Sequence, residues 1–93
     1  RAKRVGLLRS AAIALGNHPS ASGNISAGLT SLCSVLQDNE PVIRGAAAWA
    51  LGQWHRRMPE IANTIVDTLK ARLADEHDET VRQEILSGID QKE

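Results

Sequence analysis

The sequence predicts an all-α fold of five helices arranged as repeated hairpins, and three observations favour this class. Alanine and leucine supply 13 and 10 of the 93 residues, whereas phenylalanine and tyrosine are absent. This composition is typical of closely packed helices, because a sheet uses β-branched and aromatic residues on its faces. Apolar residues recur at helical spacings of three and four. Related segments also recur at intervals of 35 to 38 residues, which indicates a repeat protein.

The first two helices are predicted from their end signals. The first spans about residues 3–16 and ends at Gly16 and Asn17, with a proline shortly after. Glycine after the last helical turn followed by proline is a common carboxy-terminal stop. The second helix runs from about Asn24, whose side chain can cap free backbone amides, to Gln37.

Prolines and acidic residues introduce the other three helices. The third spans about residues 38–56 and has Pro41 in its first turn, where the missing amide hydrogen is tolerated. The fourth is expected to start at Pro59 and to continue to about residue 74. An acidic segment, residues 75–78, then leads into a fifth helix at about residues 79–90.

The clearest internal repeat joins residues 8–16 and 43–52, which share an arginine, an alanine-rich stretch and the ending Ala-Leu-Gly. A more divergent third copy covers residues 81–89. A single helical hairpin buries little apolar surface, so neighbouring copies are expected to stack in one domain. The expected division is a first repeat at about residues 3–37, a second at about 38–74 and a half repeat at about 75–93.

The third helix opens with the pattern D-x-x-P-x-x-R, formed by Asp38, Pro41 and Arg44, and small residues follow it. An α-helical hairpin with this opening resembles the HEAT-type repeats. In such repeats, acidic residues and arginines can pair across the boundary between neighbours. We therefore expect a structural ladder of inter-repeat ion pairs, rather than ligand contacts, from Asp38, Arg44, Asp75 (or its neighbour Glu76) and Arg82.

The formal net charge of zero hides a separation of charge along the chain. Residues 1–37 carry four bases and no acid, whereas residues 38–57 sum to +1 and residues 58–93 to −5. The basic amino-terminal part can face an anion such as a phosphate backbone. The competing interpretation is that these bases are solvated and have no ligand.

The sequence offers no catalytic or metal-binding set. Its single cysteine, Cys33, excludes an internal disulfide framework, a cysteine-ligated zinc site and an iron–sulfur cluster held by this chain alone. The histidines are isolated, and no phosphate loop or nucleophile motif is present. The acidic residues 75–79 are expected to charge-match the start of the fifth helix rather than to bind a cation. No apolar run approaches the ~20 residues of a bilayer crossing, so we expect no membrane contact and a cytoplasmic location.

A longer motif resembles one particular family. Residues 4–17 match the pattern R-x-G-x-L-R-N-x-x-x-A-L-G-N, except that Ser10 stands at the asparagine position. Together with Ala-Ala-Trp-Ala-Leu-Gly at residues 47–52, this motif resembles the carboxy-terminal HEAT-like region of epoxyqueuosine reductases. Phycobilin-lyase-type HEAT proteins share much of the same pattern. Because the first residue is Arg1, we expect the chain to be a piece of a longer protein.

The resemblance implies that the parent protein reduces epoxyqueuosine at the tRNA wobble position with cobalamin and two [4Fe–4S] clusters. Those cofactors would belong to upstream catalytic domains of the same chain, and this segment would dock the anticodon stem-loop of the tRNA. Phosphate contacts of this kind position a nucleic acid without reading its sequence. The candidate RNA-binding residues are Arg1, Lys3, Arg4, Arg9, Arg56 and Arg57, with Trp54 and His55 beside them.

The two tryptophans are expected to differ in role. Trp49 lies within the alanine-rich stripe and is predicted to be part of the core. Trp54 precedes His55 and two arginines at a helix end, where its ring can stack on a base or cover the turn to the next helix. The alternative for the whole chain is a protein-interaction scaffold or a purely structural repeat module.

Overall fold

The computed structural model describes the backbone of residues 2–90 and the side chains in this range except those of residues 2, 21 and 22. This part of the chain is entirely helical in its regular structure, so the all-α prediction is confirmed. The elements, in chain order, are α1 (Ala2–Asn17), η1 (Pro19–Ser22), α2 (Ile25–Val35), α3 (Pro41–Arg57), η2 (Pro59–Ile61), α4 (Ala62–Asp75) and α5 (Glu79–Ile89).

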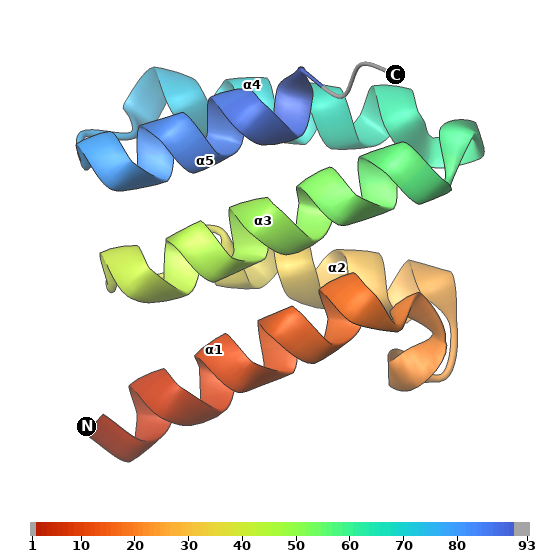
Figure 1. Ribbon diagram of the computed structural model, residues 1–93, viewed down its shortest axis with the longest axis horizontal. Coiled ribbons are helices and arrows are strands. Elements are labelled where there is room, and N and C mark those ends of the chain that lie inside the picture. The colour runs from red at the N-terminus through yellow and green to blue at the C-terminus, as the bar shows by residue number, and fades with distance from the viewer. Residues whose placement is uncertain (1, 91–93) are drawn as a thin grey trace.

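The helices form two layers. In Figure 1, α1, α3 and α5 lie side by side in the front layer with α3 in the middle, and α2 and α4 lie behind them. The most extensive helix contacts are those of α3 with α1 and with α5. The resulting slab measures 36 × 30 × 20 Å. None of the helices in residues 2–90 is both long and apolar enough to cross a bilayer.

Local capping explains where several helices begin. The side chain of Asn24 accepts a hydrogen bond of 2.7 Å from the amide of Ala27 at the start of α2. The carboxylate of Asp78 accepts one of 3.0 Å from the amide of Val81 in α5. Pro41 occupies the first position of α3. These contacts satisfy amides that have no partner within their own helix.

The fourth helix differs from its expected start. Pro59 begins the short 3₁₀ turn η2, and α4 itself begins at Ala62. The amide of Ile61 donates to the carbonyl of Met58 at 3.1 Å, which is the tighter hydrogen-bond pattern of a 3₁₀ turn. Pro59 therefore ends the connection from α3 and does not start an α-helix.

Small residues allow the front layer to pack closely around α3. A Cβ added to Gly16 of α1 would lie 2.5 Å from the Trp49 ring and 3.0 Å from the Cα of Ala50. On the other side of α3, a Cβ on Gly88 of α5 would lie 3.3 Å from the Cα of Gly52. Four of the buried side chains of α3 are alanines, and the others are Ile43, Leu51 and Trp54. Backbones can approach closely at these positions, which explains how the chain packs with so few aromatic residues.

Candidate interaction surfaces

A buried ion pair connects α3 to the loop before α5. The Nε and Nη2 atoms of Arg44 each donate to a carboxylate oxygen of Glu76 at 2.8 Å. The Nη1 atom of Arg44 also donates to the backbone carbonyls of Asp38 and Asn39, at 2.9 and 3.1 Å. Glu76 is only 2% exposed. The Arg44 side chain therefore holds together the loops that precede two successive helices of the front layer.

A second ion pair has the same direction. Arg4 of α1 pairs with the Asp38 carboxylate in the loop before α3, so here too an arginine binds the acid of the following loop. Both ion pairs cross an expected repeat boundary, and within its own repeat Arg44 binds the backbone carbonyl of Asp38 and not its carboxylate. Arg82 likewise donates to two backbone carbonyls, those of Leu73 and Glu76, at 3.0 Å.

The expectation that Asp75 contributes to the ladder of ion pairs is wrong, because the neighbouring Glu76 takes this place. The Asp75 side chain is exposed on the last turn of α4, and the adjacent Glu76 turns inward instead. Asp75 is the last residue of the helix α4, whereas the backbone of Glu76 is extended (φ −84°, ψ 126°). One residue therefore separates an outward from an inward carboxylate, and sequence spacing alone left both open.

The ion pairs shift the ionisation of their members. Hydrogen bonds from the Arg44 guanidinium lower the pKa of the Glu76 carboxyl below its ordinary value, against the opposing effect of burial. The same contact raises the pKa of Arg44. The pKa of Asp38 is lowered first by the hydrogen bond from the amide of Glu40 and then by Arg4.

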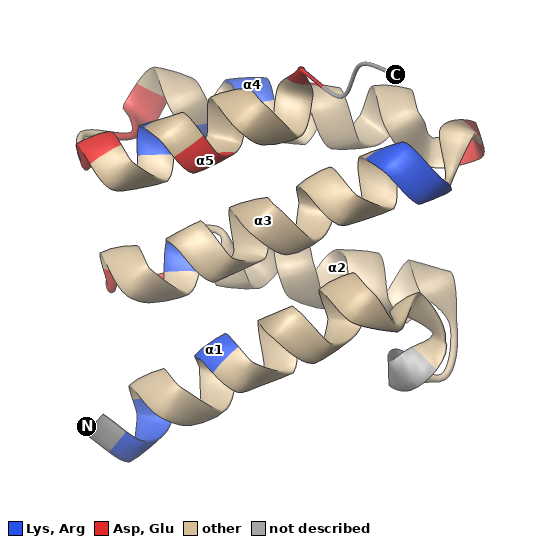
Figure 2. Ribbon diagram, viewed as in Figure 1, with Lys and Arg blue, Asp and Glu red and all other residues tan. Residues whose placement is uncertain are grey.

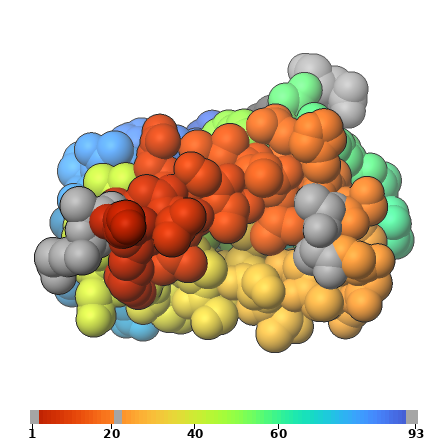
Figure 3. All heavy atoms as spheres, turned by 90° about the horizontal axis from the view of Figure 1, so that it is seen from below, coloured from red at the N-terminus to blue at the C-terminus, as the bar shows by residue number. Residues whose placement is uncertain are grey.

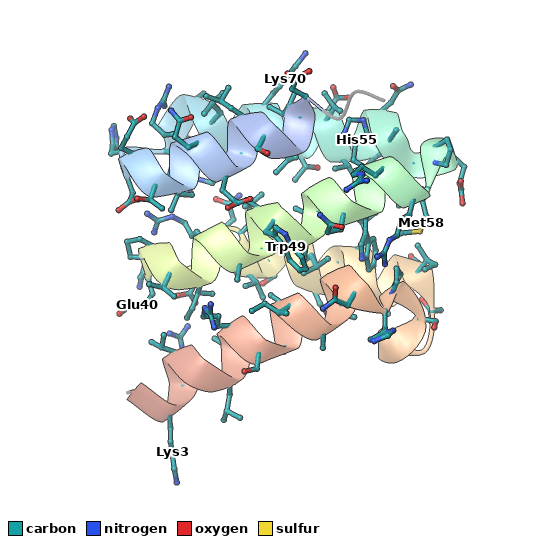
Figure 4. All side chains as sticks on the ribbon, viewed as in Figure 1. Lys3, Glu40, Trp49, His55, Met58 and Lys70 are labelled. Carbon is teal, nitrogen blue, oxygen red and sulfur yellow. The ribbon has the colours of Figure 1, made fainter. Side chains whose placement is uncertain are left out.

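The basic residues of α1 form an edge of the molecule, which we call the α1 edge and define by Lys3, Arg4 and Arg9. All three side chains are exposed, and Lys3 points away from the fold (Figure 4). Neither α1 nor α2, which together form the underside in Figure 3, contains an acidic residue. Figure 2 shows the acidic positions gathered instead around α4, α5 and the loops. The remaining amino-terminal candidate, Arg1, lies outside the described residues.

The candidates at the end of α3 are mostly engaged in packing. Trp54 is fully buried, and its Nε1 donates to the carbonyl of Leu15 at 2.8 Å. The predicted stacking of Trp54 on a base is therefore wrong for this arrangement. Trp54 lies three residues beyond Leu51 and four beyond Ala50, so it belongs to the same buried face of the helix. In the sequence, the cationic residues that follow Trp54 favoured an exposed position for it.

Two more residues of this group bind backbone carbonyls. Arg57 donates to the carbonyls of Gly16 and Asn17, at 3.2 and 2.8 Å, and so satisfies the end of α1. The Nδ1 atom of His55 lies 2.9 Å from the carbonyl of Gly88, which requires a proton on this nitrogen. Arg56 is exposed. Arg57 of α3 binds the last residue of α1, whereas Lys3 lies in the first turn of α1, about 21 Å away along the helix axis. The candidates therefore do not converge on one point.

The front layer contains a groove that the sequence did not indicate. It runs over the first half of α3, has a volume of about 560 Å³ and lies between α1 on one side and α5 on the other. We call it the central groove; its floor includes Val42, Gly45 and Trp49, and its walls carry Arg9 from α1 and Asp78 and Glu84 from α5. The groove depends on how three helices lie relative to one another, which a linear pattern does not reveal.

Trp49 packs against the hydrophobic core, as its position in the alanine-rich stripe predicted, but it is only partly buried. The side chain is half-buried on the floor of the central groove, and Figure 4 places it between α3 and α1. Gly16 leaves space for one edge of its ring. Of the two tryptophans, Trp54 is therefore the fully buried one and Trp49 the partly exposed one.

Residues 2–90 contain no group of three histidine, cysteine, aspartate or glutamate side chains that could hold a metal ion. The lone Cys33 is half-buried in α2. These residues therefore do not fit an iron–sulfur cluster, which needs several thiolates. The acidic residues 75–79 serve structure instead, through the inward Glu76 and the capping Asp78.

Comparison with known proteins agrees with the helical arrangement. A profile of the family described as HEAT repeats matches residues 5–90, nearly the whole chain. Neither a curated protein nor a solved structure gives a significant match. The stacked helical layers, the ion pairs from the helices α1 and α3 to the loops before α3 and α5, and this match lead to the same conclusion. The chain belongs to the HEAT-repeat family.

Proposed function

We propose that the chain is a non-catalytic docking module of an epoxyqueuosine reductase and that its α1 edge contacts the phosphates of a tRNA anticodon stem-loop. The observation that carries the proposal is the excess of positive charge on this edge, where, among the described residues, Asp38 pairs with Arg4 alone. Lys3 and Arg9 are exposed on a helix without acidic residues, and the neighbouring α2 has none either. Phosphate groups are attracted to such a surface without any need for base-specific contacts.

The sequence motif supports the same assignment. Residues 4–17, which resemble the epoxyqueuosine reductase pattern, coincide with α1. Part of the motif has a structural use, since Gly16 admits Trp49 and Arg4 pairs with Asp38. Cobalamin and the [4Fe–4S] clusters, which supply the electrons for reduction, would be held by other domains of the parent protein. This chain would hold the RNA in position.

The test compares the binding of an anticodon stem-loop RNA to the chain and to two variants at several salt concentrations. Lys3→Gln combined with Arg9→Gln removes two exposed cations of the α1 edge without touching the Arg4–Asp38 pair. We expect weaker binding and a slope of log K against log[salt] that is shallower by about 1.5. Lys70→Gln is the matched control, because Lys70 is an exposed cation on α4.

Equal affinity and equal slope for the wild type and the double variant would exclude the α1 edge as the RNA-binding surface. An equal loss for Lys70→Gln would indicate attraction by overall charge and not by this edge. If the chain binds no RNA at all, the remaining function is that of a protein-interaction scaffold.

A further inference from the structure

We propose that the central groove binds an amphipathic helix of a partner protein, with basic residues along one flank of that helix and acidic residues along the other. This surface shares Arg9 with the α1 edge, but its other charged and floor residues belong to α3, α5 and the loop before α5, so it can be tested separately from the RNA proposal.

The floor of the groove is apolar and open. Val42 is 55% exposed, although it lies in a hollow, and the Trp49 ring is half-buried beside it. Gly45 lies between them in the sequence, and a Cβ added there would meet only the Cγ2 of Val81, at 4.0 Å. The absent side chain leaves room for a partner to approach the α3 backbone. Covering this floor with apolar side chains would remove Val42 and Trp49 from water, which is the main source of binding energy in such grooves.

The walls carry opposite charges. Arg9 stands on the α1 wall, and Asp78 and Glu84 stand on the α5 wall (Figure 2 shows the charged positions of both helices). The described residues provide neither Arg9 nor Glu84 with an ion pair or side-chain hydrogen bond, so both charges are available to a partner. A bound segment with an acid facing Arg9 and a base facing Glu84 is complementary to the groove. A helix with the same charge on both flanks would place one of its flanks against a groove wall of the same charge.

The shape of the groove favours a helix as the occupant. The three front helices run side by side, so the groove follows the α3 axis over about 12 Å from Pro41 to Trp49, or roughly two turns. An extended peptide would need backbone hydrogen-bond partners, which the outer surface of a helical layer does not offer. A helix satisfies its own backbone and contributes only side chains. The acids of the α5 wall also repel phosphate, which disfavours nucleic acid in this groove.

The experiment uses three synthetic helical peptides, each about four turns long, with the same leucines at spacings of three and four. The first has lysines on one flank and glutamates on the other; the second has lysines on both flanks, and the third has glutamates on both. Binding is measured by calorimetry and by the fluorescence of Trp49. The wild type should prefer the mixed peptide by about three-fold or more over either of the others, as expected for a few exposed charge pairs.

Charge reversal should change this preference in a defined way. Arg9→Glu makes both walls acidic, and we expect the lysine peptide to become the tightest ligand. Glu84→Arg should move the preference toward the glutamate peptide. A helix can lie in either direction along the groove. The peptides therefore differ in how many of their flanks are basic or acidic, and not in which flank carries which charge.

Blocking the floor provides the second test. Val42→Glu should abolish binding of the mixed peptide, whereas Leu86→Glu should leave it unchanged, because Leu86 is an exposed apolar residue of α5 that does not line the groove. Both sites are exposed, so neither change should unfold the chain; circular dichroism checks this. The proposal is overturned if the wild type binds none of the peptides, if the charge reversals leave the preference unaltered, or if both glutamate variants behave alike. Loss of stem-loop RNA binding in Val42→Glu would assign the groove to RNA and overturn it as well.

Discussion

Replacing Glu76 with alanine is expected to destabilise the chain strongly, because this carboxylate neutralises two poorly solvated arginines. Arg44 donates to it twice at 2.8 Å, and the Nε of Arg72 lies 3.3 Å from one of its oxygens. The side chains of these arginines are only 13% and 15% exposed. Removing the carboxylate leaves both cations without their counter-charge, and it also removes the acceptor for the amide of Asp78.

The magnitude follows from these contacts. A hydrogen bond to a charged group contributes about 1.5–3 kcal/mol, and breaking a buried ion pair by deleting one member costs about 3–5 kcal/mol. Arg44 keeps its bonds to two backbone carbonyls, which limits the loss. We therefore expect Glu76→Ala to lower the free energy of unfolding by about 3 kcal/mol. This is a large part of the stability of a small domain.

The assay is urea unfolding at pH 7, followed by circular dichroism. Asp75→Ala is the matched control, because it removes the neighbouring acid, whose side chain is exposed; it should change the free energy of unfolding by less than about 0.5 kcal/mol. Combining Glu76→Ala with Arg44→Met should cost less than the sum of the single changes. A loss below about 1 kcal/mol for Glu76→Ala, or an equal loss for Asp75→Ala, would refute the assignment of Glu76 as the buried anion.

Two further predictions concern helix packing and pH. Gly16→Ala should lower the free energy of unfolding by about 1–3 kcal/mol, because the new Cβ would lie 2.5 Å from the Trp49 ring. Gly6→Ala, where a Cβ meets nothing within 4 Å, should raise it by up to about 1 kcal/mol in the same urea experiment; a similar loss at both sites would contradict the close contact. Because the folded-state pKa values of Glu76 and Asp38 are lowered, the stability that these groups contribute is complete above their ordinary values of 4.5 and 3.8. It is lost as the pH falls through the folded values. The urea midpoint of the wild type should therefore decline in acid, and Glu76→Ala should decline less; parallel curves would count against the carboxylate as the titrating group.

The helices could be predicted because their signals are local. Asn24 caps α2, Pro41 begins α3 and Asp78 caps α5, and each acts on amides within a few residues of itself. The start of α4 was misplaced because a proline is equally compatible with the first position of a 3₁₀ turn, which is what Pro59 begins. Hydrophobic spacing and end signals decide which segments are helices but not which tight turn connects them.

The environment of single side chains was harder to predict, because it depends on contacts between distant segments. Trp54 is buried in the core and donates to the carbonyl of Leu15, which lies 39 residues away, and the buried carboxylate of Glu76 binds Arg44 from another helix. The central groove has no counterpart in the sequence pattern, since Arg9 and Glu84 face it from opposite sides of α3.

The sequence by itself determined the helical class, the repeat and the separation of charge, because composition and periodicity carry these properties along the chain. Only the tertiary structure decided which charges remain available. All four of Lys3, Arg4, Arg9 and Arg57 are exposed, but Arg4 and Arg57 are bound to groups of other segments. A charged or aromatic side chain is bound or buried wherever a neighbouring helix offers it a partner. The stacking of α1, α3 and α5 determines which helix is the neighbour, and the adjacent residues in the sequence do not.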